Sequence, residues 1–456
     1  MNQLTQKKAL YYQNKLIKRV LILGLGISGK SVFNYLTKNF HLTVYYYDEN
    51  DQTNFTNQST EIKDLSQLSE IDLIIASPGF DLREERFNPI KKLNCPIICD
   101  LELFSHITTK PIIAITGSNG KSTVTSLITS LLNHLNIKAK ACGNIGIAVF
   151  DLLDNDYDVF IIEISSFQLD LMQSFTALIG IITNISKDHL DRYSDYQAYK
   201  QSKLQLAKRV NYIICNLDLN SIITHSNITY YDQQDLFKID NQNITYINDP
   251  IVSINNIYLK GKHNHLNILM SLLAVEYYLK IQNITYSKTI KMAAFKKALV
   301  TFENLPSRCH VFANYNGVTW IDDSKGTNIG ATKAAISGLS KEQASEKNCI
   351  LILGGLSKGG DFSELQPEID RYIKTIYLFG QDKTLIKNQI KHTNIKLYTT
   401  LDEIVLLIKQ NSAKGDIILF SPACASFDQF DNYLQRGQYF RTLVERINTA
   451  KQTESL

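Results

Sequence analysis

The sequence lacks the features of a secreted, membrane-spanning or nucleic-acid-binding protein. Its seven cysteines are an odd number scattered over 456 residues, which excludes a disulfide framework and indicates a reducing compartment. The formal net charge is only +4, too small to favour nucleic acid or a membrane surface. No signal peptide is recognised, and the apolar run at 20–25 is far too short to span a bilayer. We therefore expect a cytoplasmic protein with no membrane or nucleic-acid partner.

The remaining composition is that of a globular chain. Hydrophobic residues make up 44% and charged residues 20%, and the length suits about three domains. Strands alternate with helices throughout, which indicates parallel sheets with helical crossovers. The predicted fold class is α/β with three domains, each built on a largely parallel sheet. We expect a Rossmann-like domain at 1–109, a P-loop domain at 110–305 and a Rossmann-like C-terminal domain at 306–456.

Several elements can be predicted from the pattern alone. The runs at 159–165 and 178–185 are continuously apolar, as in central parallel strands that are buried on both faces. The stretch 212–259 is strand-like with many turn residues and predicts hairpins at an edge. Residues 50–60 are rich in Asn, Gln and Thr and predict a loop. Helices are expected from about 28 to 37, from about 265 and over 287–300.

The most informative segment is IIAITGSNGKSTVTSLITSLL at 112–132. An apolar strand runs into a glycine-containing loop, and an apolar-periodic helix follows. Backbone N–H groups of such a loop, together with the helix N-terminus, hold phosphate groups. Lys121 is then expected to reach the outer phosphates, and the Ser122 hydroxyl to ligate Mg²⁺. The alternative is an ordinary tight strand–helix turn, since Ile115 stands where a full Walker A motif has glycine.

A second glycine-rich turn, Gly24–Gly29, reads G-x-G-x-x-G between a strand and a helix, with Asp48 about 20 residues further on. Alone it suggests NAD, but any nucleotide diphosphate can use a helix N-terminus and a nearby carboxylate. Packing without a ligand is a third interpretation. Ser77-Pro78-Gly79 ends another strand of the same sheet, where further ligand contacts are expected.

Other polar residues follow the carboxyl ends of predicted strands. Glu163 ends one strand and His189 follows the next, and a carboxylate and an imidazole beside phosphates suit Mg²⁺, although a lone His is commonly structural. Asn264 and Asn267 lie three apart at a helix start, where they can contact adenine or phosphate, or Asn264 can simply cap the helix.

In the third unit, three strand-end loops carry Asp322–Asn328, Lys358 and Ser426. Lysines and hydroxyls gathered at one sheet edge predict a site for an anionic small molecule. Arg308, just after Pro306, is placed to bridge ATP between units.

These segments together resemble the Mur ligase family. The resemblance covers nearly the whole chain, in order, and is carried by these motifs: GLGISG, SPG, TGSNGKST, GNIG, EISSFQLD, NISKDHLDRYSDYQAYKQSK, GKHNHLN, LPSRC, DDSKGTN, LILGGLSKGGDF and SPACASFDQFDNYLQRG. It implies an ATP- and Mg²⁺-dependent ligase that adds D-glutamate to UDP-N-acetylmuramoyl-L-alanine through an acyl phosphate, in peptidoglycan precursor synthesis.

The resemblance also implies roles for individual residues. ATP would be held by Gly117, Ser118, Asn119, Gly120, Lys121, Ser122, Thr123, Asn264, Asn267, Arg308 and Asp323. The UDP-substrate would contact Ile27, Ser28, Asp48, Gly79, Asn144 and Gln168. D-Glutamate would contact Lys325, Thr327, Lys358, Ser426, Phe427 and Tyr433. Mg²⁺ would be held by Ser122, Glu163, His189 and Lys203, the last as a carbamate. Lys121, Glu163, His189 and Lys203 would form the catalytic set.

Two departures and three rival interpretations remain at this stage. Glu49 and Asn50 stand where better-known members have Thr and Arg at the uracil site, and the N-terminus carries about a dozen extra polar residues. A folylpolyglutamate-synthetase-like ligase would ordinarily lack the Gly24–Gly29 unit. A nicotinamide-dependent oxidoreductase would leave Lys121, Glu163 and His189 without a role, and a P-loop switch would not need a third unit. We expect a monomer.

Overall fold

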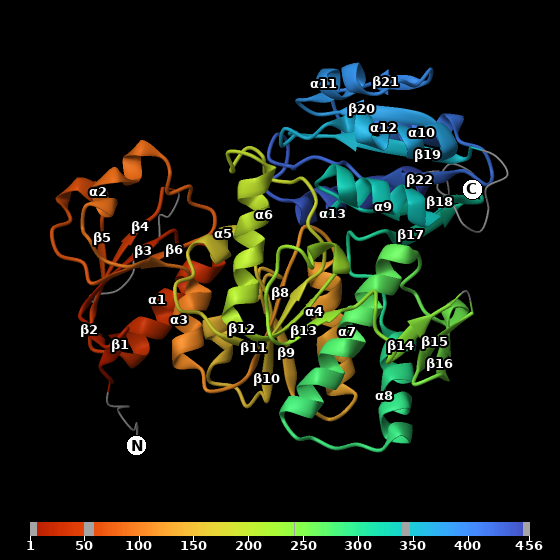
Figure 1. Cartoon of the computed structure of the whole chain (residues 1–456). Coiled ribbons are helices and arrows are strands. Elements are labelled where there is room, and N and C mark those ends of the chain that lie inside the picture. The colour runs from red at the N-terminus through yellow and green to blue at the C-terminus, as the bar shows by residue number, and fades with distance from the viewer. Residues whose placement is uncertain (1–6, 50–58, 241, 340–346, 450–456) are drawn as a thin grey trace.

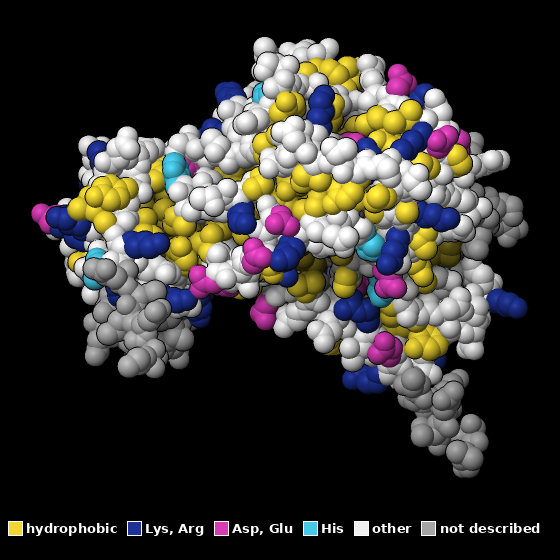
Figure 2. All heavy atoms as spheres, turned by 90° about the horizontal axis from the view of Figure 1, so that it is seen from below, with side chains coloured by type: hydrophobic (Ala, Val, Ile, Leu, Met, Phe, Trp, Pro, Cys, Tyr) yellow, Lys and Arg dark blue, Asp and Glu magenta, His cyan; other side chains and the backbone are white. Residues whose placement is uncertain are grey.

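The structure is a computed structural model that describes residues 7–49, 59–240, 242–339 and 347–449 (Figure 1). Three largely parallel α/β sheets follow one another along the chain, which confirms the predicted fold class. On the face seen in Figure 2, Lys and Arg side chains are interspersed with Asp and Glu, in keeping with the small net charge. In the described ranges, every helix is too short or too polar to cross a bilayer.

The N-terminal sheet has five parallel strands in the order β5-β4-β3-β6-β7. Its strands are β3 (Arg19–Leu23), β4 (Thr43–Tyr47), β5 (Ser59–Glu61), β6 (Leu73–Ala76) and β7 (Ile97–Ile98). Its helices are α1 (Ile27–Asn39), α2 (Asn88–Lys91) and α3 (Asp100–Ile107). The predicted loop at 50–60 therefore ends in a strand, while 50–58 lie outside the described residues.

The extra N-terminal residues form a hairpin of β1 (Leu10–Tyr12) and β2 (Lys15–Ile17). Leu10, Tyr12 and Ile17 are buried in the same apolar cluster as β3. Apolar residues at alternate positions thus give this polar stretch a packed face.

The middle sheet has six parallel strands in the order β13-β12-β11-β8-β10-β9. They are β8 (Ile112–Thr116), β9 (Ala139–Gly143), β10 (Val159–Glu163), β11 (Ala177–Ile182), β12 (Val210–Cys215) and β13 (Ile228–Tyr230). The helices are α4 (Lys121–Asn133), α5 (Ser166–Asp170), α6 (Tyr196–Leu204), α7 (Lys262–Ile281) and α8 (Lys288–Thr301). The central positions of β8, β10 and β11 explain their continuous apolar sequences.

The prediction of edge hairpins over 212–259 is only partly right. β12 and β13 extend the parallel sheet, and only β14 (Phe237–Ile239), β15 (Asn243–Tyr246) and β16 (Asp249–Ser253) form an antiparallel sheet of their own. The short strands gave no sequence signal that separates a parallel neighbour from a hairpin partner.

The C-terminal sheet has the order β17-β18-β22-β19-β20-β21, with β17 antiparallel and the others parallel. Its strands are β17 (His310–Tyr315), β18 (Val318–Asp322), β19 (Cys349–Gly354), β20 (Ile373–Phe379), β21 (Ile395–Leu397) and β22 (Ile417–Phe420). Its helices are α9 (Ile329–Leu339), α10 (Gln366–Tyr372), α11 (Lys383–Gln389), α12 (Leu401–Asn411) and α13 (Tyr433–Thr449).

The apolar cores are distributed unevenly among the sheets. One cluster joins Val20 and Ile22 of the N-terminal sheet to Ala114 and Phe160 of the middle sheet. The C-terminal sheet instead has a cluster on each of its two faces, without residues from the other sheets. The first two sheets therefore share a hydrophobic core, whereas the third has its own.

Candidate active site

The site lies where three neighbouring strands of the middle sheet end. In the parallel register Glu163 of β10 pairs with Ile115 of β8, and Ile182 of β11 pairs with Thr116 of β8. The phosphate loop, Glu163 and the segment that leads to His189 therefore leave one edge of the sheet together.

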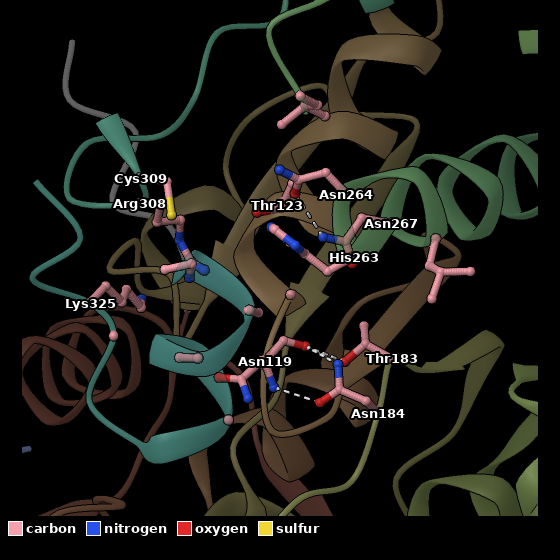
Figure 3. Close-up of a pocket in the computed structure, with 18 of the residues that line it drawn as sticks. Asn119, Thr123, Thr183, Asn184, His263, Asn264, Asn267, Arg308, Cys309 and Lys325 are labelled. Carbon is pink, nitrogen blue, oxygen red and sulfur yellow. Dashed lines mark hydrogen bonds between the residues drawn. The ribbon is translucent and has the colours of Figure 1, made fainter. Parts of the chain in front are cut away.

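The phosphate loop has a backbone that other residues rarely adopt and glycine adopts readily. Gly117 has φ of +145° and Gly120 φ of +85°, and a Cβ on Gly117 would lie 1.9 Å from Thr183 Oγ1. The loop is braced by the next strand end: the Asn119 amide donates to Asn184 Oδ1 at 3.0 Å, and Thr183 Oγ1 donates to the Asn119 carbonyl at 2.6 Å (Figure 3). A preformed loop with this support is suited to phosphate.

Lys121 begins α4 and folds back on the loop. Its Nζ donates to the carbonyls of Gly117 at 2.9 Å and Ser118 at 3.1 Å. Burial lowers the pKa of Lys121, and the neighbouring carboxylates of Glu163 and Asp188 oppose that shift. The ammonium is thus held beside the loop where a phosphate would lie.

Glu163 is fully buried next to the loop and accepts from two side chains. Ser122 Oγ donates to Oε2, and Asn144 Nδ2 donates to Oε1 at 2.9 Å. Burial opposes ionisation, but Lys325, Lys121 and Arg308 outweigh it and lower the pKa of Glu163 to about 2. A hydroxyl and an ionised carboxylate are the hard oxygen ligands that Mg²⁺ takes.

Mg²⁺ fits this donor set better than a metal that needs many protein ligands. In the ranges that the structure describes, no three His, Cys, Asp or Glu side chains form a cluster that could hold an ion. Mg²⁺ keeps several waters and uses one or two carboxylates with substrate phosphates. Ser122 and Glu163 meet that requirement.

Close to this edge, Lys203 is buried and His189 is half-buried. His189 has φ of +54°, and its ring lies 5.0 Å from that of Phe167. Burial, together with Lys358, lowers its pKa to about 3, so the imidazole is neutral. Lys203 Nζ donates to the Gly117 carbonyl at 2.8 Å, and burial takes its pKa well below the ordinary value, with Lys121 adding to the shift. Lys203 is therefore an amine held directly under the phosphate loop.

A cavity of about 330 Å³ opens between the phosphate loop, the start of α7 and the residues that lead into the C-terminal sheet (Figure 3). The residues predicted for ATP that line it are Asn119, Gly120, Thr123, Asn264, Asn267, Arg308 and Asp323. Of the others predicted for ATP, Gly117 and Ser118 belong to the adjoining loop, and Lys121 and Ser122 to the first turn of α4. The structure thus brings the predicted nucleotide residues together from segments far apart in sequence.

Two details of this cavity were not predicted. Helix α7 is capped by Gly261, so Asn264 is not its cap, and Asn264 Oδ1 instead accepts from Asn267 Nδ2 at 3.2 Å. Burial raises the pKa of Asp323 to about 7, although Ser421 Oγ donates to its carboxyl at 2.6 Å.

The residues predicted for D-glutamate divide into three groups. Lys325 lines the nucleotide cavity, and its Nζ donates to Tyr433 Oη at 2.8 Å. Lys358 and Thr327 line a separate cavity of about 50 Å³, where Lys358 Nζ is ion-paired with Asp188 at 2.5 Å. Ser426 and Phe427 line neither cavity: Ser426 is buried and Phe427 is 71% exposed.

The residues predicted for the UDP-substrate are divided between the N-terminal unit and the middle unit. Asp48 Oδ2 accepts from the Leu25 amide, so the carboxylate lies on the glycine-rich turn. Ser77 Oγ donates to the Gly24 carbonyl at 3.0 Å and thereby joins that turn to the loop with Gly79. Ile27, 68% exposed, and Ser28 begin α1.

The two predicted amides of the UDP-substrate set have protein partners. Asn144 holds Glu163, as described, and Gln168 Nε2 donates to Asp100 Oδ1 at 3.1 Å. Glu49 is ion-paired with Arg86, and Asn50 lies outside the described residues.

Asp188 is a polar residue of the site that the sequence analysis missed. It is buried, pairs with Lys358 and accepts from Asn328 Nδ2 at 2.8 Å. Asn328 in turn donates to Asn119 Oδ1 at 3.2 Å. Asp188 directly precedes His189 after a strand end, so the rule that selected His189 would also have found it.

A phosphate loop, a buried carboxylate beside it and cations that reach it from a second sheet define a nucleotide-dependent enzyme of the three-domain α/β class. Family models described as "Mur ligase MurD-like, N-terminal domain", "Mur ligase middle domain" and "Mur ligase, glutamate ligase domain" match residues 18–99, 115–275 and 307–424. The chain belongs to the Mur ligase family.

The relatives match over nearly the full length. A protein of Francisella philomiragia subsp. philomiragia named UDP-N-acetylmuramoylalanine--D-glutamate ligase is 36% identical, over 96% of this chain and 99% of its own. One of the same name from Aliivibrio salmonicida is 35% identical, over 95% and 99%. The structure of MurF ligase from Thermotoga maritima in complex with ADP has a TM-score of 0.60 at 14% identity, with 99% of this chain and 100% of that chain covered, and so shares the fold.

Proposed function

We propose that this chain is an ATP-dependent ligase that joins D-glutamate to UDP-N-acetylmuramoyl-L-alanine during synthesis of the peptidoglycan precursor. Relatives that carry the name of this activity match it nearly end to end. One contact carries the proposal in the structure: Arg308 Nη2, just before the C-terminal sheet, donates to Ser122 Oγ of the phosphate loop at 2.6 Å. Lys325 Nζ approaches the same hydroxyl at 3.4 Å. The nucleotide loop thus meets the unit that is expected to hold the amino acid.

The proposal assigns one substrate to each unit. Residues 1–109 would hold the UDP-substrate through the glycine-rich turn, Asp48 and the loop with Gly79. Residues 110–305 would hold ATP, and residues 306–456 would hold D-glutamate through two lysines, Lys325 and Lys358. Two carboxylates on D-glutamate give a reason for two cations.

The residues of the middle unit have separate tasks in this proposal. The loop amides and Lys121 bind the triphosphate and stabilise charge on the transferring phosphoryl group. Ser122 and Glu163 would hold Mg²⁺, with neutral His189 and Lys203 beside them. When bound, Mg²⁺ supplies positive charge that neutralises the phosphate oxygens. Burial lowers the pKa of Lys203 and so favours the neutral amine that reaction with CO₂ to a carbamate requires, and a carbamate would give the site another oxygen ligand.

The reaction follows from these positions. The substrate carboxylate attacks the γ-phosphorus of ATP, and the bond from that phosphorus to the β-phosphate oxygen breaks. The products of this step are ADP and an acyl phosphate. The amine of D-glutamate then attacks the acyl carbon, an amide bond forms, and phosphate and a proton are released. Closure of the C-terminal unit over the phosphate loop would exclude water from the acyl phosphate.

The direct test is phosphate release from ATP in the presence of UDP-N-acetylmuramoyl-L-alanine, Mg²⁺ and each of several amino acids. We expect release with D-glutamate and background rates with L-glutamate, L-lysine and glycine. Release that is independent of the UDP-substrate, or equal for all amino acids, would contradict the proposal. Omission of Mg²⁺ is the matched control for its role.

A further inference from the structure

Helix α5 lies at the junction of the first two sheets (Figure 1). A groove of about 240 Å³ is lined by residues of the loop after β6 and of helix α5. Its walls come from three segments, and include Phe80, Asp81, Arg83, Phe167, Arg192 and Tyr193. Phe80 directly follows Ser77-Pro78-Gly79, and Phe167 directly precedes Gln168. Gly79 and Gln168 are residues proposed to contact the UDP-substrate, so this groove borders that part of the site.

Arg192 is the residue that connects the two walls. Its Nη2 donates to the Phe80 carbonyl at 3.3 Å, and its Nε lies 3.3 Å from Asp81 Oδ2. On the opposite side the guanidinium lies 4.3 Å from the centre of the Phe167 ring. One planar side chain thus bonds the N-terminal loop with its edge and packs on the middle unit with its face, which suits arginine and not lysine.

The contact continues to the phosphate edge through Phe167. The rings of Phe167 and His189 are 5.0 Å apart at 72°, an edge-to-face arrangement. The ring of Tyr193 is stacked with that of Phe167, at 5.9 Å and 13°. His189 is held in a left-handed backbone conformation (φ +54°), which needs support from its surroundings. A displacement of the Phe167 ring would therefore change the position of the His189 ring.

We propose that Arg192 is a positioning residue that sets the Ser77–Phe80 loop relative to the Phe167–His189 pair, so that the UDP-substrate is presented to the phosphate edge. This inference rests on the proposed function, because the loop matters only if the UDP-substrate lies on it. Arg192 acts through the Phe80 carbonyl, Asp81 and Phe167, and not by contact with a reacting atom.

The chain offers a matched control in Arg83. Its Nε and Nη2 donate to the same Asp81 carboxylate at 2.8 and 2.6 Å, but these contacts stay within one loop. Arg83→Met removes one positive charge and one partner of Asp81 without breaking a link between units. We expect it to change affinities by no more than about twofold, as for other exposed ion pairs.

The experiment measures binding of UDP-N-acetylmuramoyl-L-alanine by calorimetry without ATP, together with KM for each substrate. Arg192→Met should weaken UDP-substrate binding about tenfold or more, since two charge-assisted contacts are lost, and leave KM for ATP within about twofold. Arg192→Lys should not restore it, because an ammonium cannot bond Phe80 and Asp81 and stack on Phe167 together.

A double-variant cycle tests the route of the effect. If Arg192 acts through Asp81, the Asp81→Asn and Arg192→Met effects on binding will be clearly less than additive. Additive effects, or a binding loss that is equal for ATP, would overturn the inference. Arg192→Lys and Asp81→Asn keep the test available if Arg192→Met does not fold.

Failure of the inference is distinguishable from failure of the proposed function. A wild-type chain that forms ADP with both substrates, beside an Arg192→Met variant with unchanged UDP-substrate binding, would overturn only the role of Arg192. A folded wild-type chain that neither binds the UDP-substrate nor forms ADP would overturn both.

Discussion

Glu102→Gln should destabilise the chain strongly, although it replaces only one heavy atom of the side chain. Glu102 lies in α3 and is fully buried, and its carboxylate accepts five hydrogen bonds. Oε1 accepts from Tyr12 Oη at 3.0 Å, from the Ser174 amide at 2.8 Å and from Ser174 Oγ at 2.7 Å. Oε2 accepts from the amides of Gln173 at 3.1 Å and Phe175 at 2.8 Å. The residue therefore ties the N-terminal hairpin and α3 to the turn before β11.

The magnitude follows from counting donors. In glutamine one oxygen becomes an NH₂ group, which faces donors whichever way the amide is turned. The better orientation points the NH₂ at the hydroxyls of Tyr12 and Ser174, which can rotate to accept, but it leaves the Ser174 amide unpaired. The other orientation leaves the amides of Gln173 and Phe175 unpaired. An unpaired buried donor costs about 1–3 kcal/mol and the remaining bonds lose charge assistance, so we expect a loss of about 2–4 kcal/mol.

Urea unfolding followed by circular dichroism measures this loss, with Tyr12→Phe as the matched variant. Tyr12→Phe removes one donor and leaves the carboxylate otherwise satisfied, so it should cost about 1 kcal/mol. A Glu102→Gln variant within about 1 kcal/mol of wild type, or no less stable than Tyr12→Phe, would refute the reasoning.

The pH dependence has a definite sign. Burial opposes ionisation of Glu102, but the hydrogen bonds from Ser174, Tyr12 and Gln173 outweigh it and lower its pKa. The folded state thus binds the proton more weakly than the unfolded chain, whose value is about 4.3. The stabilisation is complete above that pH and is lost as the pH falls through the lower folded value. The difference in the free energy of unfolding between wild type and Glu102→Gln should therefore become smaller in acid.

Three further changes test the site. Gly120→Ala should abolish ATP binding in a filter or calorimetric assay, because φ is +85° and the new Cβ would lie 2.6 Å from Asn267 Oδ1; near-normal binding would contradict the geometry of the loop. Lys203→Ala should remove ligase activity, and short carboxylic acids should partly restore it by supplying an anion; the absence of rescue would weaken the carbamate proposal. Lys325→Ala should raise KM for D-glutamate far more than KM for ATP, and equal increases would place the lysine with the nucleotide, whose cavity it lines.

The fold could be predicted because the strongest sequence patterns, apolar runs and glycine-rich loops, correspond to the central strands and to the phosphate loop. The apolar runs that end in TGSNGKST and EIS are central strands, since only strands covered on both faces are apolar without alternation. Glycines at 117 and 120 marked the phosphate loop in the sequence, and both have a positive φ, which other residues rarely adopt. Ligands bind at the carboxyl ends of parallel strands, and this rule predicted that Glu163 and His189 belong to the site.

What the sequence did not reveal depends on contacts between distant segments. The hairpin at Leu10–Ile17 looked merely polar, because its packed face consists of only three residues. The strand-end rule that selected His189 also covers Asp188, but nothing in the sequence indicated its partners Lys358 and Asn328, which lie more than a hundred positions away. Lys325 and Lys358 were both predicted for the D-glutamate site from their strand-end positions, but those positions did not reveal that Lys325 lines the nucleotide cavity and Lys358 the smaller one.

The two sides of the site are joined in physically different ways, and this bears on how the proposed reaction can be ordered. The first two sheets share an apolar cluster and the buried Glu102 network, so separating them would expose core residues and unpair a charge. The C-terminal sheet has its own cores and reaches the phosphate edge through polar pairs such as Arg308–Ser122, Lys358–Asp188 and Asn328–Asn119. Polar pairs can be exchanged for contacts with water or with a substrate at little net cost, whereas a shared core cannot.

The UDP-substrate would therefore bind to a fixed crevice between the first two sheets. The D-glutamate lysines would arrive on the part of the molecule that is free to close last, after the carboxylate and ATP are in place.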